Sequence, residues 1–141
     1  MAITKEQWKD IEYEMLSPFG SVSLLIDGYE VTLAVKPNGP RKFAILPYVN
    51  GFFKGAYLRL DSEEGRRFYK PITRHVLSLK QRQELIKVYG GKRCPKADLE
   101  RINKTINGIE PIWTSVKALR LHYEKQNKDL QLVKIGIGTS L

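Results

Sequence analysis

The first amphipathic pattern of the chain begins at Thr4. Apolar side chains then recur three or four residues apart, the spacing of one helix face, at Trp8, Ile11, Met15 and Leu16. Thr4 and Gln7 have the spacing of a capping box, in which each side chain satisfies a backbone N–H of the other residue. Pro18 disfavours helical geometry at Ser17. The pattern predicts a helix that starts after Thr4 and stops before Pro18.

Alternating apolar positions next predict a hairpin around Asp27-Gly28. This dipeptide suits a two-residue type I′ turn, because both central positions of that turn need a positive φ. The turn sets a register that pairs Ile26 with Tyr29, Leu24 with Val31, and Val22 with Leu33. All six side chains then share one face of the sheet, and we expect that face to cover the core.

A second hairpin is expected at Asn50-Gly51. Its register pairs Val49 with Phe52, Ile45 with Ala56, and Phe43 with Leu58. Pro47 cannot donate a hydrogen bond, so strand 42–49 is expected to lie at a sheet edge or to carry a bulge. The other face of this hairpin carries three aromatic rings and two cations: Tyr48, Phe53, Tyr57, Lys42 and Arg59.

The rest of the chain reads as mainly helical. Asp61 or Ser62 can cap a short helix, and Ser78 with Gln81 repeats the capping-box spacing before a helix that Gly90-Gly91 stops. The pattern then predicts a short helix over 96–103, a short strand over 105–109, a helix over about 115–127 capped by Thr114, and a closing strand from Leu130 to Ile137.

These elements predict the fold class. We expect one α+β domain over residues 1–141, with an antiparallel sheet of about four to five strands that includes two consecutive hairpins. The N-terminal and C-terminal helices are expected to pack on this sheet. The order of one helix and three strands resembles that of double-stranded RNA-binding domains, which is an analogy of fold and not of function.

Charged residues are unevenly distributed along the chain, and this distribution bears on function. The chain has 24 Lys and Arg against 15 Asp and Glu, a net charge of +9. Residues 1–60 hold seven cations and six anions, whereas residues 61–141 hold seventeen and nine. Such a balance favours polyanionic partners: nucleic acid, an anionic membrane surface or an acidic protein face. A basic surface can also serve solubility alone, so both interpretations stay open.

Candidate polyanion-binding residues fall into three groups along the second part of the chain. They are Arg66, Arg67, Lys70 and Arg74; Lys92, Arg93 and Lys96; and Lys117, Arg120, Lys125 and Lys128. The first group stands beside Glu63 and Glu64, so mutual pairing on one helix face is the alternative there. The last two groups form one basic stripe only if the fold brings them together. Lysines of this kind attract phosphates without reading sequence.

The aromatic face formed by Tyr48, Phe53 and Tyr57 with Lys42 and Arg59 is the second candidate site. Exposed aromatic rings between cations stack unpaired bases in several small folds. A protein-binding hot spot has a similar composition. The structural alternative is that a helix covers this face and the three rings belong to the core.

Catalytic motifs are not found. The two histidines, His75 and His122, have no cysteine or carboxylate at metal-ligand spacing, and no phosphate-binding loop or nucleophile elbow occurs. Asp27 and Glu30 are close in sequence but lack the acidic-x-Lys pair of a metal-dependent nuclease. We therefore expect no enzyme activity, no cofactor and no metal.

Cysteine content and hydropathy bear on location. Cys94 is the only cysteine, which excludes an intrachain disulfide. The N-terminus lacks the apolar core of a signal peptide, and no apolar run approaches the length of a membrane span. The expectation is a cytoplasmic protein with no membrane partner, and the sequence says nothing of its oligomeric state.

The whole chain resembles short, uncharacterised accessory proteins of bacteriophages and prophages. The segments that carry the resemblance are ITKEQW, GSVSLLIDGYEVTLAV, YVNGFFKGAYL, RRFYKPITR and a Trp-Thr-Ser entry into a basic last helix. The resemblance brings no catalytic residues with it. It implies a phage accessory protein in the cytoplasm of a bacterial host, of a kind that often binds and inhibits host machinery.

Three functional hypotheses follow. The first is a non-enzymatic phage protein that binds a host protein or nucleoprotein complex and modulates or inhibits it, for example as an anti-defence or anti-CRISPR-like factor. The second is a direct, sequence-nonspecific binder of DNA or RNA. The third is a metal-dependent nuclease. A steep loss of binding with salt distinguishes the second from the first.

Overall fold

The computed structural model describes residues 2–136 and has an α+β fold. Its contacts divide the chain into two compact units. Unit 1 is Met1–Lys70 with Ile109–Leu141, and unit 2 is Pro71–Gly108. The expectation of one domain over residues 1–141 stays a prediction, because a division by contacts does not test whether either part folds alone.

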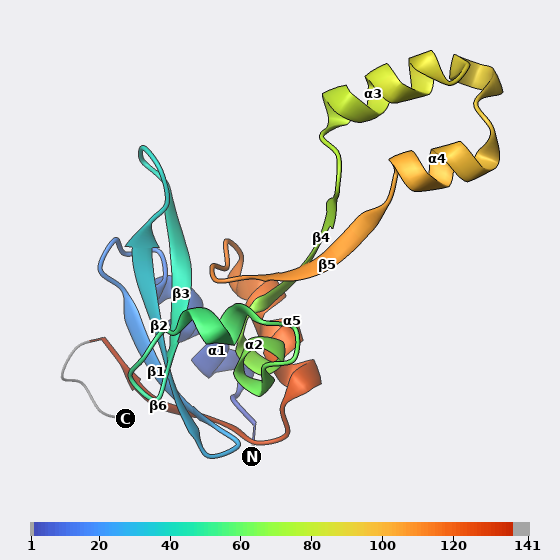
Figure 1. Ribbon diagram of the computed structural model, residues 1–141. Helices are drawn as coiled ribbons and strands as arrows, with labels where there is room; N and C mark the ends of the chain where they lie inside the picture. Colours follow the sequence, from blue (N-terminus) through green and yellow to red (C-terminus); the bar gives the residue numbers. More distant parts are fainter. Residues whose placement is uncertain (1, 137–141) are drawn as a thin grey trace. The chain divides into compact units, whose positions relative to one another are not determined.

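Unit 1 is built on a four-stranded antiparallel sheet with the strand order β3-β2-β1-β6 (Figure 1). Its elements are α1 (Lys5–Glu14), β1 (Ser21–Ile26), β2 (Tyr29–Pro37), β3 (Phe43–Val49), the 3-10 helix η1 (Gly55–Leu58), α2 (Glu63–Phe68), α5 (Val116–Gln126) and β6 (Leu130–Ile135). The predicted strand from Leu130 is confirmed as far as Ile135, and Ile137 lies outside the described residues.

The capping box predicted for α1 is present. The Gln7 N–H donates to the Thr4 hydroxyl oxygen over 3.1 Å, and the Thr4 N–H donates to the Gln7 amide oxygen over 2.9 Å. Trp8, Ile11 and Met15 are buried as expected. Leu16 was placed on the same face and is 78% exposed, because α1 ends at Glu14 and the chain turns away before Leu16.

The first hairpin has the predicted register. Asp27 and Gly28 both have positive φ, and Val22 pairs with Leu33, Leu24 with Val31, and Ile26 with Tyr29. Five of these six side chains are buried and Tyr29 is half-buried. Local turn chemistry therefore determines both the register of β1 and β2 and the face that covers the core.

The second hairpin forms only at its tip. Val49 bridges Phe52 as predicted, but the expected pairs of Ile45 with Ala56 and Phe43 with Leu58 are wrong. The reason is that the backbone of Ile45 exchanges two hydrogen bonds of 2.8 Å with Trp113, which takes the place expected for Ala56. Residues 55–58 form η1 instead, and β3 pairs with β2, so that strands β1 to β3 make two consecutive hairpins. β3 is an edge strand, as Pro47 predicted.

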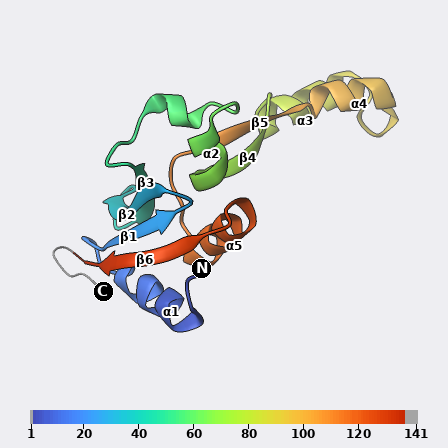
Figure 2. The ribbon, with the colours of Figure 1, turned by 90° about the horizontal axis from the view of Figure 1, so that it is seen from below.

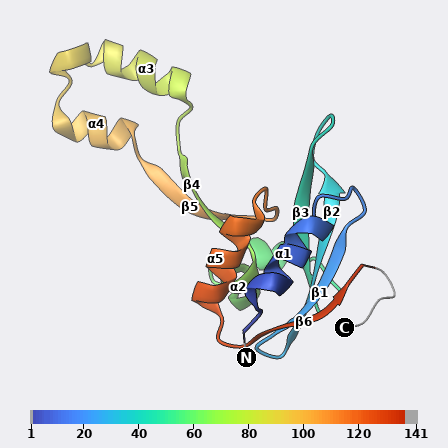
Figure 3. The ribbon, with the colours of Figure 1, turned by 180° about the vertical axis from the view of Figure 1, so that it is seen from behind.

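Helices α1 and α5 supply the apolar side chains that cover the buried face of the sheet, and α1 crosses β1 and β6 (Figure 2, Figure 3). Helix α2 is attached to α5 and to the segments that flank α5 by several hydrogen bonds. The Phe68 oxygen accepts from the Trp113 indole N–H and from the Tyr123 hydroxyl, both over 2.9 Å. These two donors satisfy a buried acceptor at the end of α2, where the helix itself provides none.

The cap of α5 lies one residue later than predicted. The Ser115 hydroxyl, and not Thr114, accepts from the Ala118 N–H over 3.2 Å. The pairing of Trp113 with Ile45 keeps the chain extended up to this point. Ser115 is as good a capping residue as Thr114, so the sequence pattern alone did not distinguish them.

Unit 2 is a helical hairpin on a two-stranded sheet (Figure 1). Its elements are β4 (Lys70–His75), α3 (Leu79–Val88), the 3-10 turn η2 (Gly91–Arg93), α4 (Lys96–Ile102) and β5 (Thr105–Glu110). The Ser78–Gln81 capping box and the left-handed Gly90 and Gly91 are confirmed. Strand β4 was not predicted, because only Ile72 and the flanking Pro71 marked it in the sequence.

Candidate functional site

Unit 2 carries most of the net charge of the protein. Residues 71–108 hold nine Lys and Arg against three Asp and Glu, which is +6 of the total +9. Within this unit the structure gives an ion pair to Arg101, which contacts Asp98 over 3.0 Å, and an interaction to Arg74. The cations with no ion pair among the described residues are Lys80, Arg82, Lys87, Lys92, Arg93, Lys96 and Lys104.

The candidate group Lys92, Arg93 and Lys96 lies at the connection between α3 and α4. Gly90 and Gly91 have φ values of 115° and 60°, and they reverse the chain here. Cys94 is buried between these cations, so the three charged side chains are held on a short, anchored turn. All three are exposed, and the arrangement presents three positive charges within five residues.

The cations of α5 lie in unit 1 and border a groove between α1 and α5. Lys117 and Arg120 line this groove together with Lys5 and Lys9, and Lys128 lies at its far end. Arg120 is partly neutralised, since its Nε donates to Glu124 over 2.6 Å and its guanidinium lies over the Trp8 ring. Lys125 is exposed, also on α5.

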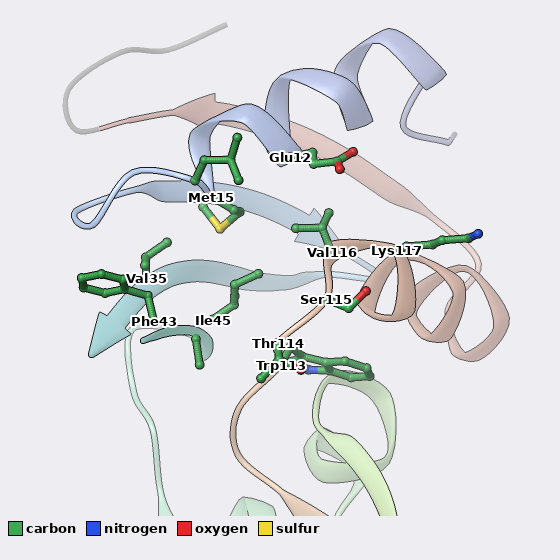
Figure 4. Close-up of a pocket in the computed structure, with 12 residues that line it drawn as sticks. Glu12, Met15, Val35, Phe43, Ile45, Trp113, Thr114, Ser115, Val116 and Lys117 are labelled. Atoms are coloured by element: carbon green, nitrogen blue, oxygen red, sulfur yellow. The ribbon is translucent and has the colours of Figure 1, made fainter. Parts of the chain in front are cut away.

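The opposite end of the groove opens into an apolar pocket of about 290 Å³. Figure 4 shows Met15, Val35, Phe43, Ile45 and Val116 around it, with Glu12 and Lys117 at its rim. Phe43 was paired with Leu58 in the predicted second hairpin, and it is 49% exposed at this pocket. The pocket contains one acidic and one basic side chain, so it offers apolar surface and not a strong anion site.

The Arg67 side chain is occupied by contacts within the protein. Its guanidinium contacts Asp27 over 2.9 Å and Glu63 over 3.0 Å, and it donates to the Asn127 side chain over 3.1 Å. The pairing of Arg67 with Glu63 follows the alternative given for this group in the sequence. Arg66 is exposed and Lys70 is half-buried where β4 begins. This first group therefore offers fewer available charges than its sequence indicates.

The aromatic face is partly buried, because a ring of the core packs against two of its members. Phe53 and Tyr57 contact the buried Tyr69, with ring centroids 5.8 and 6.1 Å apart. Tyr57 is half-buried, and Phe53 remains 37% exposed. Burial also raises the pKa of Tyr69 above its ordinary value, and the Tyr69 hydroxyl donates to the Pro47 carbonyl over 2.6 Å. Tyr69 is the supporting ring that sequence reasoning missed.

The remaining members of the aromatic face lie around this cluster. Tyr48 is half-buried, and the Lys36 ammonium lies 5.7 Å from its ring centroid. Lys42 and Arg59 are exposed, and Arg59 contacts Asp61 over 3.4 Å. The predicted register pairs Phe52 with Val49, which is buried, yet the Phe52 side chain is 60% exposed. The Lys54 ammonium lies 5.4 Å from the Phe52 ring centroid.

Asp27, one of the two candidate catalytic carboxylates, has other partners, whereas Glu30 is exposed. Asp27 accepts from the backbone N–H groups of Lys128 and Asp129 and from Arg67. Within residues 2–136 no three His, Cys, Asp or Glu side chains gather at metal-binding distance. Burial lowers the pKa of His122, whose ring packs on Trp113. His75 is exposed.

Comparison with models of protein families, with curated proteins and with solved structures finds no match to this chain. The resemblance to phage accessory proteins therefore stays a prediction. Among the helices of the described residues, none has both the length and the apolar character needed to cross a membrane. The candidate site rests on the geometry and charge of the protein itself.

Proposed function

We propose that this protein binds nucleic acid directly and without sequence preference, through the cations of unit 2. The observation that carries the proposal is the group of seven Lys and Arg in this unit that have no ion pair among the described residues. Unpaired cations are available to replace the counterions of a phosphate backbone. They confer no sequence readout, because phosphates are the same at every base.

The anchored turn at Lys92, Arg93 and Lys96 is the part of unit 2 best suited to this role. Its cations are close in sequence and exposed, and they follow the chain reversal at Gly90 and Gly91. The nearest carboxylate in sequence, Asp98, already contacts Arg101. A phosphate backbone that meets this turn therefore encounters positive charge with little local competition.

The test is the salt dependence of binding to a labelled DNA duplex and to a labelled single strand, measured by fluorescence anisotropy. The variant replaces Lys92, Arg93 and Lys96 by Gln together. We expect weaker binding and a plot of log K against log salt that is shallower by about 2 to 3, since each lost phosphate contact removes about 0.9 from the slope on duplex DNA.

A matched control removes the same charge from unit 1. Lys5, Lys9 and Lys117 are exposed and line the groove between α1 and α5, so their replacement by Gln lowers the net charge equally. We expect this control to keep a slope near that of the unaltered protein. Equal losses in both variants would assign binding to net charge and not to unit 2. Absence of any DNA or RNA binding at low salt would end the proposal.

The second candidate is the non-enzymatic binding and inhibition of a host protein or nucleoprotein complex. One observation favours it: unit 2 exposes large apolar side chains that phosphate contacts do not use. They are Val76, Leu79, Val88 and Ile106, each at least 55% exposed. Exposed apolar groups beside cations are typical of protein interfaces.

Affinity capture from a nuclease-treated bacterial lysate at moderate salt tests this candidate. We expect one complex of defined stoichiometry to be retained and then lost when Val76 and Val88 are both replaced by Ser. Material captured from an untreated lysate but not from the nuclease-treated one would support direct nucleic-acid binding instead.

A further inference from the structure

The turn at Asn50-Gly51 holds its aromatic side chains on a rigid backbone. Val49 and Phe52 exchange two backbone hydrogen bonds, of 2.8 and 3.1 Å. The Asn50 N–H donates to the Glu30 carbonyl over 2.7 Å, and the Asn50 side chain accepts from the Glu30 N–H over 3.0 Å. This turn is thus attached to the start of β2. A ring on such a turn loses little conformational freedom when it binds.

Phe52 has no structural task that accounts for its position. Its ring is 60% exposed, whereas a phenylalanine with a packing role is ordinarily buried. Phe53, the next residue, leans on Tyr69 and keeps 37% of its surface exposed. Two adjacent aromatic side chains therefore reach the surface, one supported by the core and one projecting.

Positive charge accompanies these rings. The Lys54 ammonium lies over the Phe52 ring, 5.4 Å from its centroid. Lys54 has no ion pair among the described residues. An ammonium beside a ring can meet the phosphate of a nucleotide whose base stacks on that ring.

We infer that Phe52 and Phe53, with Lys54, form a stacking surface for unpaired bases, and that this surface gives the protein a preference for single-stranded nucleic acid. The inference rests on the proposed function but concerns unit 1, whereas the phosphate contacts are proposed for unit 2. Bases in a duplex are already stacked on their neighbours and do not offer a free face. The aromatic surface therefore discriminates strandedness, and the cations of unit 2 do not.

Oligothymidylate, an abasic oligonucleotide of equal length and a DNA duplex are the probes. We expect the unaltered protein to bind oligothymidylate more tightly than the abasic strand. Phe52→Ala should weaken oligothymidylate binding by roughly 5- to 150-fold, the range for one lost base–aromatic stack. The affinities for the abasic strand and for the duplex should remain unchanged, because the phosphate contacts are intact. The salt slope should remain unchanged for the same reason.

Two further variants separate stacking from other roles of this residue. Phe52→Trp should retain the preference for oligothymidylate, and Phe52→Leu should lose it, since leucine keeps the apolar surface but has no ring. Phe19→Ala is the matched control, because Phe19 is 87% exposed elsewhere in unit 1. It should bind all three probes as the unaltered protein does.

The outcomes distinguish the inference from the proposed function. Equal binding of oligothymidylate by the Phe52→Ala variant and the unaltered protein would overturn the stacking surface alone. Full retention by Phe52→Leu would also overturn it, and would mean that Phe52 contributes apolar surface and not ring stacking. Failure of the unaltered protein to bind any of the three probes would overturn the proposed function, and the inference with it.

Discussion

At the scale of single residues, Asp27 connects distant parts of unit 1. Its carboxylate accepts from the Lys128 N–H over 3.0 Å, from the Asp129 N–H over 2.8 Å and from Arg67 over 2.9 Å. The two backbone donors, with Arg67, hold the pKa of Asp27 below its ordinary value. Asp27 therefore has two roles: it forms the turn between β1 and β2, and it holds the connection between α5 and β6 by hydrogen bonds.

Replacement of Asp27 by Asn tests this role. The variant keeps a dipeptide suited to the turn but removes the acceptor charge, so we expect a loss on the order of 1–3 kcal/mol in the free energy of unfolding. The folded state lowers the pKa of the Asp27 carboxyl. The stabilisation by its carboxylate is therefore complete above the ordinary pKa of about 4, and it is lost as the pH falls through the pKa of the folded state. Chemical denaturation at several pH values measures it. A difference that is constant with pH would contradict the argument.

At the scale of elements, α2 depends on close approach to the chain before it. A Cβ on Gly65 would overlap the Tyr57 carbonyl oxygen and would lie 3.0 Å from the Ile109 Cδ1. This contact places Phe68 and Tyr69 in the core, where both are fully buried. The short helix is therefore defined by packing and by its Ser62 cap more than by helix propensity.

Gly65→Ala should destabilise the protein by about 2 kcal/mol or more, because a backbone clash cannot be relieved by rotating a side chain. In an open helix the same change ordinarily stabilises by about 1 kcal/mol. Gly55→Ala is the matched control, since nothing lies within 4 Å of the added Cβ. It should leave the urea midpoint nearly unchanged. A Gly65→Ala midpoint equal to that of the control would show that the approach is not needed.

At the scale of the whole molecule, burial and charge are divided between the two units. Unit 1 contains nearly all buried apolar side chains, whereas in unit 2 only Cys94 and Ile102 are buried among the described residues. Unit 2 carries most of the net charge. The stable core and the charged surface of this protein are thus built from different stretches of the chain.

Hydrogen exchange should report this division. Amides in α3 and α4 are expected to exchange faster than those of β1 and β2, because local opening of unit 2 exposes few buried apolar groups. Peptide-level mass spectrometry measures the difference, with α5 as the helical reference in unit 1. Equal protection in α3, α4 and α5 would mean that unit 2 opens only when the whole protein unfolds.

The sequence by itself determined the features that depend on neighbouring residues. Capping boxes at Thr4 and Ser78, the Asp27-Gly28 turn and the register of β1 and β2 all follow from groups within a few positions of one another. The α+β class and the edge position of β3 followed in the same way. Local hydrogen bonds and allowed φ angles suffice for these choices.

Only the tertiary structure decided which of two distant segments pairs with the edge of β3. Trp113 occupies the edge of β3 that the sequence assigned to Ala56, and Phe52 is 60% exposed although its partner Val49 is buried. The strand β4 and the concentration of unpaired cations in unit 2 also appear only in the fold. The physical reason is that long-range partners are chosen by packing and hydrogen bonding between residues far apart in sequence, which local patterns do not encode.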